Sequence, residues 1–361
     1  MMTVCWFRGS QTNAFNRLSA FALAIALILG GWSALASAAP AEFDDGAIYQ
    51  VRHPEWFKES FLDLRDDAEE AADAGKLGLF IFFSTQGCSY CHLFIEQSLN
   101  DPQIAARLKQ SFDSFGLEIF SDAELTDFSG TRTRVKTFAL DQGVQFAPTL
   151  LFYDTAGKRL LRLTGYYPPE RFRQVLDYLI DGHVRRQSLS AYLAETATNA
   201  ATADASAGLL PDALFSPPPY ALDRSRLPAE RPLLVLFEGA DCTRCAHFHQ
   251  TVLKDMPTRT RLSAFDLVRL DAGDAQTPVL TPDGARVTPR DWYRSLGFTE
   301  LPALVFFDES GQALIATDAL VLNSRMNNLI GYVTERAYER GWNYQRYARS
   351  QGQKRFQNAS E

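Results

Sequence analysis

Length, composition and charge already exclude several kinds of protein. With 361 residues, 46% of them hydrophobic and 22% charged, the chain has room for two hydrophobic cores and is neither a disordered nor a collagen-like protein. Its formal net charge is −7 and it contains no strongly basic stretch, which argues against nucleic acid as a partner.

The N-terminus has the order of a signal peptide. Two arginines and no acidic residue precede an apolar run, Leu18 to Leu29, and small residues follow it up to Ala36-Ser37-Ala38. We therefore expect residues 1–38 to be a signal peptide, removed together with Cys5, and the mature protein to be periplasmic. The alternative is an uncleaved membrane anchor over residues 18–39, because that segment is about long enough to cross a bilayer.

Two later segments share one pattern, at a constant offset of 154 residues. Residues 78–83 (GLFIFF) and 232–237 (PLLVLF) are continuous apolar runs, which predict buried strands. Each run is followed by two cysteines that two residues separate, and then by apolar residues at helical spacing. The pairs are Cys88 with Cys91, and Cys242 with Cys245.

A proline follows the first cysteine of each pair after 60 residues, and an apolar run begins directly after it. The two stretches are Ala147-Pro148 before residues 149–154 and Leu301-Pro302 before residues 303–308. Spacing preserved at strands, cysteines and prolines indicates a duplicated domain.

The boundaries follow from where this pattern fades. Residues 186–220 lose their periodicity, are rich in Ala and Thr, and include a Pro-rich stretch, which predicts a linker. A helical insert in the Ala-rich part is the alternative. The first domain is then expected over residues 39–185, and the second over residues 221–361 with a helical extension at its C-terminus.

A strand, a Cys-X-X-Cys pair at the start of a helix and a later proline that opens a strand resemble the thioredoxin superfamily. In the first copy, residues 126–130, 144–154 and 163–172 also resemble the exported thioredoxin-related proteins of the SoxW type. The resemblance implies an α/β fold class with two thioredoxin-like domains in tandem, each a mixed central sheet flanked by helices. It also implies that Pro148 and Pro302 are cis-prolines, beside which an extended substrate strand can pair.

For the cysteines, the resemblance implies thiol–disulfide exchange. Cys88 and Cys242 would be the attacking sulfurs, and Cys91 and Cys245 would resolve the mixed disulfide. A helix N-terminus favours a thiolate, because it presents unpaired amides and the positive end of the helix dipole. We expect an enzyme that needs no cofactor and no metal, and whose partners are extracytoplasmic thiol or disulfide proteins.

The chain departs from standard thioredoxins at one buried position. Phe82 and Leu236 stand six residues before the first cysteine of each pair, where thioredoxins carry a buried acid. Proton transfer to and from the buried thiol must therefore use another route.

Three other interpretations remain open. Cys88 to His92 also satisfies the haem c attachment pattern, although Ala246 replaces the histidine in the second copy. The four cysteines could bind zinc if the two pairs met. His247 and His249 beside Cys245 suggest a mixed site on the second domain, but residues next to a helical cysteine mostly point away from it, so we expect a solvated helix face for both. Finally, one or both domains could be a binding module with structural disulfides.

Aromatic and basic residues alternate over residues 332–349. A helix packed on its own domain explains them better than a docking surface does.

Overall fold

The computed structural model describes residues 43–198, 209 and 212–358. The expected signal peptide or anchor, and part of the expected linker, lie outside these residues. Residues from Asp44 onward form one compact unit. Across the described ranges, no helix combines the length and the apolar character that crossing a membrane requires.

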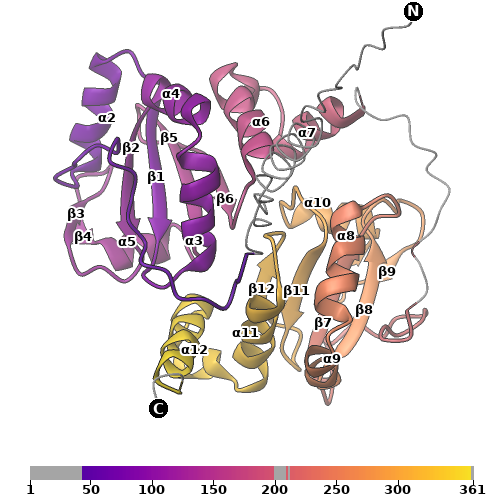
Figure 1. Cartoon of the computed structure of the whole chain (residues 1–361). Coiled ribbons are helices and arrows are strands. Elements are labelled where there is room, and N and C mark those ends of the chain that lie inside the picture. Colours follow the sequence, from indigo (N-terminus) through magenta and orange to yellow (C-terminus); the bar gives the residue numbers. More distant parts are fainter. Residues whose placement is uncertain (1–42, 199–208, 210–211, 359–361) are drawn as a thin grey trace, which may run out of the picture. The chain divides into compact units, whose positions relative to one another are not determined.

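The first copy contains one four-stranded sheet with the strand order β2-β1-β5-β6 (Figure 1). Strand β1 pairs parallel with β2 and antiparallel with β5, so the sheet is mixed. Its elements are α2 (Leu64–Asp73), β1 (Gly78–Ser84), α3 (Ser89–Phe94), η1 (Ile95–Leu99), α4 (Pro102–Ser111), β2 (Phe112–Glu118), β3 (Glu124–Thr126), β4 (Arg132–Arg134), α5 (Val135–Asp141), β5 (Thr149–Asp154), β6 (Arg159–Thr164), α6 (Pro169–Ile180), η2 (His183–Arg185) and α7 (Leu189–Thr198).

The second copy repeats this topology, with the strand order β12-β11-β7-β8. Strand β7 pairs parallel with β8 and antiparallel with β11. Its elements are β7 (Leu233–Glu238), α8 (Thr243–Phe248), η3 (His249–Leu253), α9 (Met256–Leu262), β8 (Asp266–Asp271), β9 (Val279–Leu280), β10 (Arg286–Val287), α10 (Pro289–Ser295), β11 (Ala303–Phe307), β12 (Ala313–Thr317), α11 (Asn323–Thr334), η4 (Ala337–Arg340) and α12 (Tyr344–Asn358).

The central strands form because their sequences are apolar throughout. Every residue of β1 and of β7 is buried, as expected for a strand covered on both faces of its sheet. The segment expected to be a linker contains helix α7, whose Leu189 and Leu193 are buried. Rings of Tyr178 on α6 and Tyr192 on α7 lie 5.5 Å apart, so α7 packs on α6.

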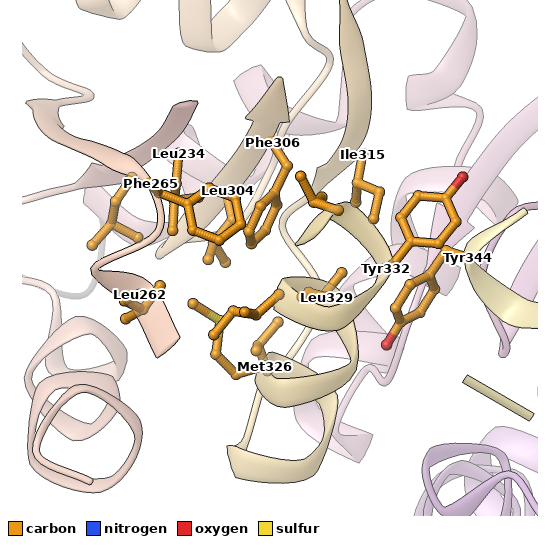
Figure 2. Packing of buried hydrophobic residues seen from close by; sticks show 14 of the residues in the cluster. Leu234, Leu262, Phe265, Leu304, Phe306, Ile315, Met326, Leu329, Tyr332 and Tyr344 are labelled. Atoms are coloured by element: carbon orange, nitrogen blue, oxygen red, sulfur yellow. The ribbon is translucent and has the colours of Figure 1, made fainter. Parts of the chain in front are cut away.

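Helices α11 and α12 complete the core of the second domain. Figure 2 shows Phe306 of β11 facing Met326 and Leu329 of α11. Tyr344 of α12 belongs to the same cluster, so the C-terminal aromatic residues pack on their own domain, as expected. Phe146 of the first copy also joins it, with its ring 4.6 Å from that of Tyr344.

Candidate active site

Each cysteine pair lies at the N-terminus of a helix, directly after a central strand. Cys88 is the N-cap of α3, and its sulfur accepts a hydrogen bond from the backbone N–H of Cys91 at 3.1 Å. Cys242 caps α8 in the same way, with the N–H of Cys245 at 3.0 Å. Both pairs form disulfides, with S–S distances of 2.09 and 2.04 Å.

The two pairs differ in exposure. The Cys88 residue is 9% exposed and Cys91 is fully buried. In the second pair Cys245 is 5% exposed, but Cys242 is only half-buried. The second pair is therefore the more accessible one, although the first copy carries the closer sequence resemblance.

Both expected prolines follow cis peptide bonds, Ala147–Pro148 and Leu301–Pro302. In the first domain Thr149 pairs with Phe83, so the Ala147–Pro148 bond lies at the sheet edge where the Cys88 loop begins. In the second domain, a Cβ added to Gly239 would lie 3.2 Å from Leu301 and 4.0 Å from Cys242. The cis geometry is as predicted; the catalytic role of the two prolines stays a prediction.

Residues far along the chain surround the first pair. The hydroxyl of Tyr90 donates to a carboxylate oxygen of Asp45 at 3.0 Å and accepts from the backbone N–H of Leu322 at 3.1 Å. The Arg325 guanidinium lies 3.5 Å from the centre of the Tyr90 ring, a cation–π contact. Burial raises the pKa of Tyr90 well above its usual value. The dipeptide between the first two cysteines is therefore held by the second domain.

The second domain also occupies both main-chain groups of Ala147. The amide of Ala147 donates to the side-chain oxygen of Gln345 on α12 at 2.9 Å. Its carbonyl accepts from the Arg325 guanidinium at 3.1 Å. These are the groups that the thioredoxin resemblance assigns to an extended substrate.

An arginine of the first domain also contacts the proline loop of the second domain. Arg171 occupies the position in the first copy that Arg325 occupies in the second, 154 residues later. It donates to the carboxylate of Glu300, beside Leu301. Glu300 also accepts from Arg244 of the second Cys-X-X-Cys motif at 2.5 Å. Each domain thus places an arginine against the proline loop of the other.

Each central strand ends in a polar residue, two residues after the position where thioredoxins carry a buried acid. Phe82 and Leu236 are buried, as the sequence predicts for strand residues. Ser84, at the end of β1, is within 2.8 Å of the His53 ring, and burial lowers the pKa of His53.

The corresponding residue of β7 is a carboxylate. Glu238 is 2% exposed, and its two carboxylate oxygens lie 2.9 and 3.0 Å from Nε2 of His249. The solvated helix face expected for His249 is wrong, because this side chain turns inward to the end of the strand.

In this structure, the cysteines that haem or zinc would need are joined in disulfides. Each cysteine is bonded within its own pair. Among the described residues, no group of three or more His, Cys, Asp or Glu side chains is arranged to hold a metal ion.

The thioredoxin-like domain family matches the chain twice, over residues 64–180 and 220–334, which together are more than half of its length. The chain belongs to this family. Two tandem thioredoxin-like domains, each with a mixed four-stranded sheet flanked by helices, confirm the predicted fold class. Two Cys-X-X-Cys motifs with disulfide geometry in thioredoxin-like domains support thiol–disulfide oxidoreductase chemistry.

Several solved structures are similar to this thioredoxin-like chain. A thioredoxin-fold protein from Helicobacter pylori has 23% identity and a TM-score of 0.32, over 40% of this chain and 88% of that one. A thioredoxin from Thermus thermophilus has 20% identity and a TM-score of 0.27, over 33% and 84%. The first two thioredoxin domains of Saccharomyces cerevisiae Eps1p have 13% identity and a TM-score of 0.21, over 78% and 98%. No curated protein matches the chain.

Sequence reasoning missed Asp45, Arg325 and Gln345 at the first thioredoxin-like site. Asp45 and Gln345 lie outside the repeated pattern, so spacing gave no indication of them. Arg325 had one available signal, since Arg171 is the same residue type at the repeat offset of 154.

Proposed function

We propose that the protein is an exported thiol–disulfide oxidoreductase whose first domain is of the SoxW type. Its partners are thiol and disulfide proteins outside the cytoplasm. Cys88 and Cys242 attack, Cys91 and Cys245 resolve the mixed disulfides, and Pro148 and Pro302 border the substrate sites.

The observation that carries the proposal is the position of each first cysteine. Its sulfur accepts the backbone N–H of the second cysteine, at the end of a helix where a negative charge is favoured. A thiolate formed there is more stable than the thiolate of a free cysteine in water. Such a thiolate can attack a disulfide, and the second cysteine, 3 residues later, is placed to release the product.

Trapping of mixed disulfides tests this assignment. Replacing a resolving cysteine, Cys91→Ser or Cys245→Ser, leaves an attacking thiol that stays bonded to its substrate. The matched controls are Cys88→Ser and Cys242→Ser, which remove the attacking thiol of the same pair. We expect stable adducts with a small model disulfide for the first two variants and none for the controls. Equal adduct levels in all four variants would refute the roles given to these cysteines.

The export proposal has its own measurement. Cell fractionation and mass spectrometry of the mature chain should find it in the periplasm, beginning at Ala39. A chain that keeps residues 1–38 in the membrane fraction would support the anchor instead, and one found in the cytoplasm would refute export.

A binding module is the second candidate for the first domain, because Cys88 and Cys91 are buried and the main chain of Ala147 is already engaged. Thiol counting distinguishes the two. If dithiothreitol under native conditions reduces Cys242–Cys245 but never Cys88–Cys91, the first disulfide is structural.

A further inference from the structure

Cys88 of the buried first pair lies at the wall of a small cavity. The cavity has a volume of about 230 Å³, and Cys88, Ala147 and Gln86 line it together with residues of α11 and α12. Pockets that hold drug-sized ligands typically measure about 300–1,000 Å³. The space beside Cys88 therefore suits a small molecule and not a folded polypeptide loop.

The main chain at the cavity offers no edge to a polypeptide. A substrate strand needs the amide and the carbonyl of Ala147, but Gln345 and Arg325 already bond to both. Main-chain hydrogen bonds are what hold an added strand, so a protein substrate would have to break two existing bonds first.

The charge of the cavity is positive although the chain is acidic overall. Arg325, Arg349 and Arg355 line it, and Asp45 is its only acidic lining residue, although Arg349 also pairs with Glu118 outside the lining at 3.4 Å. Both oxygens of Asp45 are occupied, since they accept from the N–H groups of Ser324 and Arg325. Within the described part of the chain, Arg355 is exposed and has no ion pair. A ligand carboxylate would meet an unpaired guanidinium in the same cavity that Cys88 lines.

From this geometry we propose that the Cys88 pocket takes a small thiol or disulfide that carries a carboxylate, while protein disulfides are exchanged at Cys242. The proposal rests on the thiol–disulfide chemistry proposed above and names the substrate class of the first site.

The exchange is balanced without another oxidant or reductant. The thiolate of one small thiol attacks the Cys88 sulfur, which forms a mixed disulfide and breaks the Cys88–Cys91 bond. A second thiolate attacks the small-molecule sulfur, forms the small disulfide and releases Cys88. The two protons that the small thiols lost pass to Cys91 and Cys88. The reverse steps reduce a small disulfide to two thiols and oxidise the Cys88/Cys91 dithiol to the disulfide.

Matched probes test the preference for a carboxylate. The full chain with Cys242→Ser and Cys245→Ser keeps only the first pair. The rate at which its disulfide is reduced is measured with 3-mercaptopropionate and with cysteamine, which have the same length and opposite charges. Each rate is divided by the thiolate concentration and by the rate of the same thiol with a small model disulfide. An exposed guanidinium that lines the same cavity is expected to favour the anion by about threefold to tenfold. We expect this preference to decrease with salt.

Two variants on one helix locate the source of the preference. Arg355→Gln removes the unpaired charge and should reduce the ratio of the two rates toward one. Lys354→Gln removes an equal charge from the neighbouring residue, which does not line the cavity, and should change the ratio much less. A ratio of one in the parent, or equal effects of both changes, would overturn the carboxylate assignment.

Insulin reduction separates this proposal from the proposed function. The Cys88→Ser/Cys91→Ser chain, which keeps only the second pair, should reduce insulin at least about tenfold faster than the chain that keeps only the first pair, a ratio equal to about 1.4 kcal/mol. Equal insulin rates would refute the division between the sites and leave the oxidoreductase function intact. If neither chain exchanges with insulin or with the small thiols, both proposals fail.

Discussion

Replacing Asp45 by alanine should destabilise the protein, because this carboxylate caps a helix of the other domain. Helix α11 begins at Asn323, and its own N-cap, Leu322, has no side chain that can accept a hydrogen bond. Asp45 takes that role, with one oxygen 3.1 Å from the N–H of Ser324 and the other 2.9 Å from the N–H of Arg325. The second oxygen also accepts the Tyr90 hydroxyl at 3.0 Å.

The size of the effect follows from these three hydrogen bonds. Loss of a capping side chain costs about 0.5–2 kcal/mol. A buried hydroxyl that loses its acceptor costs about 1–3 kcal/mol, although Tyr90 keeps the bond it accepts from Leu322. We expect the free energy of unfolding of Asp45→Ala to fall by about 2–4 kcal/mol in total.

Urea unfolding of the oxidised full-length protein, followed by tryptophan fluorescence, measures this loss. The midpoint should fall by about 1 M or more, since slopes in urea are about 1–3 kcal/mol per molar. Asp44→Ala is the matched control, because the Asp44 side chain is exposed and bonds to the N–H of Gly46 two residues away.

The control should stay within about 0.5 kcal/mol of the parent. A double-mutant cycle with Tyr90→Phe should then give a coupling energy of about 1 kcal/mol with Asp45→Ala. If Asp45→Ala unfolds with the same midpoint as Asp44→Ala, the capping argument is wrong.

Three more predictions concern stability. Burial lowers the pKa of His53 below its usual 6.5, so as pH falls below that value the unfolded chain binds a proton that the folded protein resists. The stability that His53 contributes should therefore be full above about pH 6.5 and decrease below it. In His53→Gln, the urea midpoint should depend less on pH between about pH 7 and 5 than it does in the parent. Gly165 has φ +90°, and a Cβ added there would lie 2.3 Å from Cβ of Ala319. Gly297 is the matched control, because its φ is +73° and the space for a Cβ is open. Gly297→Ala should cost about 1–2 kcal/mol, and Gly165→Ala should lower the urea midpoint clearly more. Phe306 is fully buried, and Phe306→Ala should cost about 3–5 kcal/mol by calorimetry or urea unfolding; a loss under about 1 kcal/mol would contradict the packing of Figure 2.

The sequence by itself determined the repeated architecture and the positions of the two cysteine pairs. Apolar runs at residues 78–83 and 232–237, each followed by a cysteine pair, were enough to locate both central strands and both helix starts. The constant offset of 154 residues also located both prolines. These features are readable because a strand, a turn and the first turn of a helix depend on residues that are neighbours along the chain.

Tertiary structure decided which cysteine pair is accessible. The amide of Ala147 and the side chain of Gln345 meet across 198 residues, and the main chain of Arg325 meets Asp45 across 280. No periodicity links such residues, because their contact depends on how two separately folded sheets and their helices pack. The same packing buries Cys88 and leaves Cys242 half-buried, so two motifs with the same cysteine spacing acquire different surroundings.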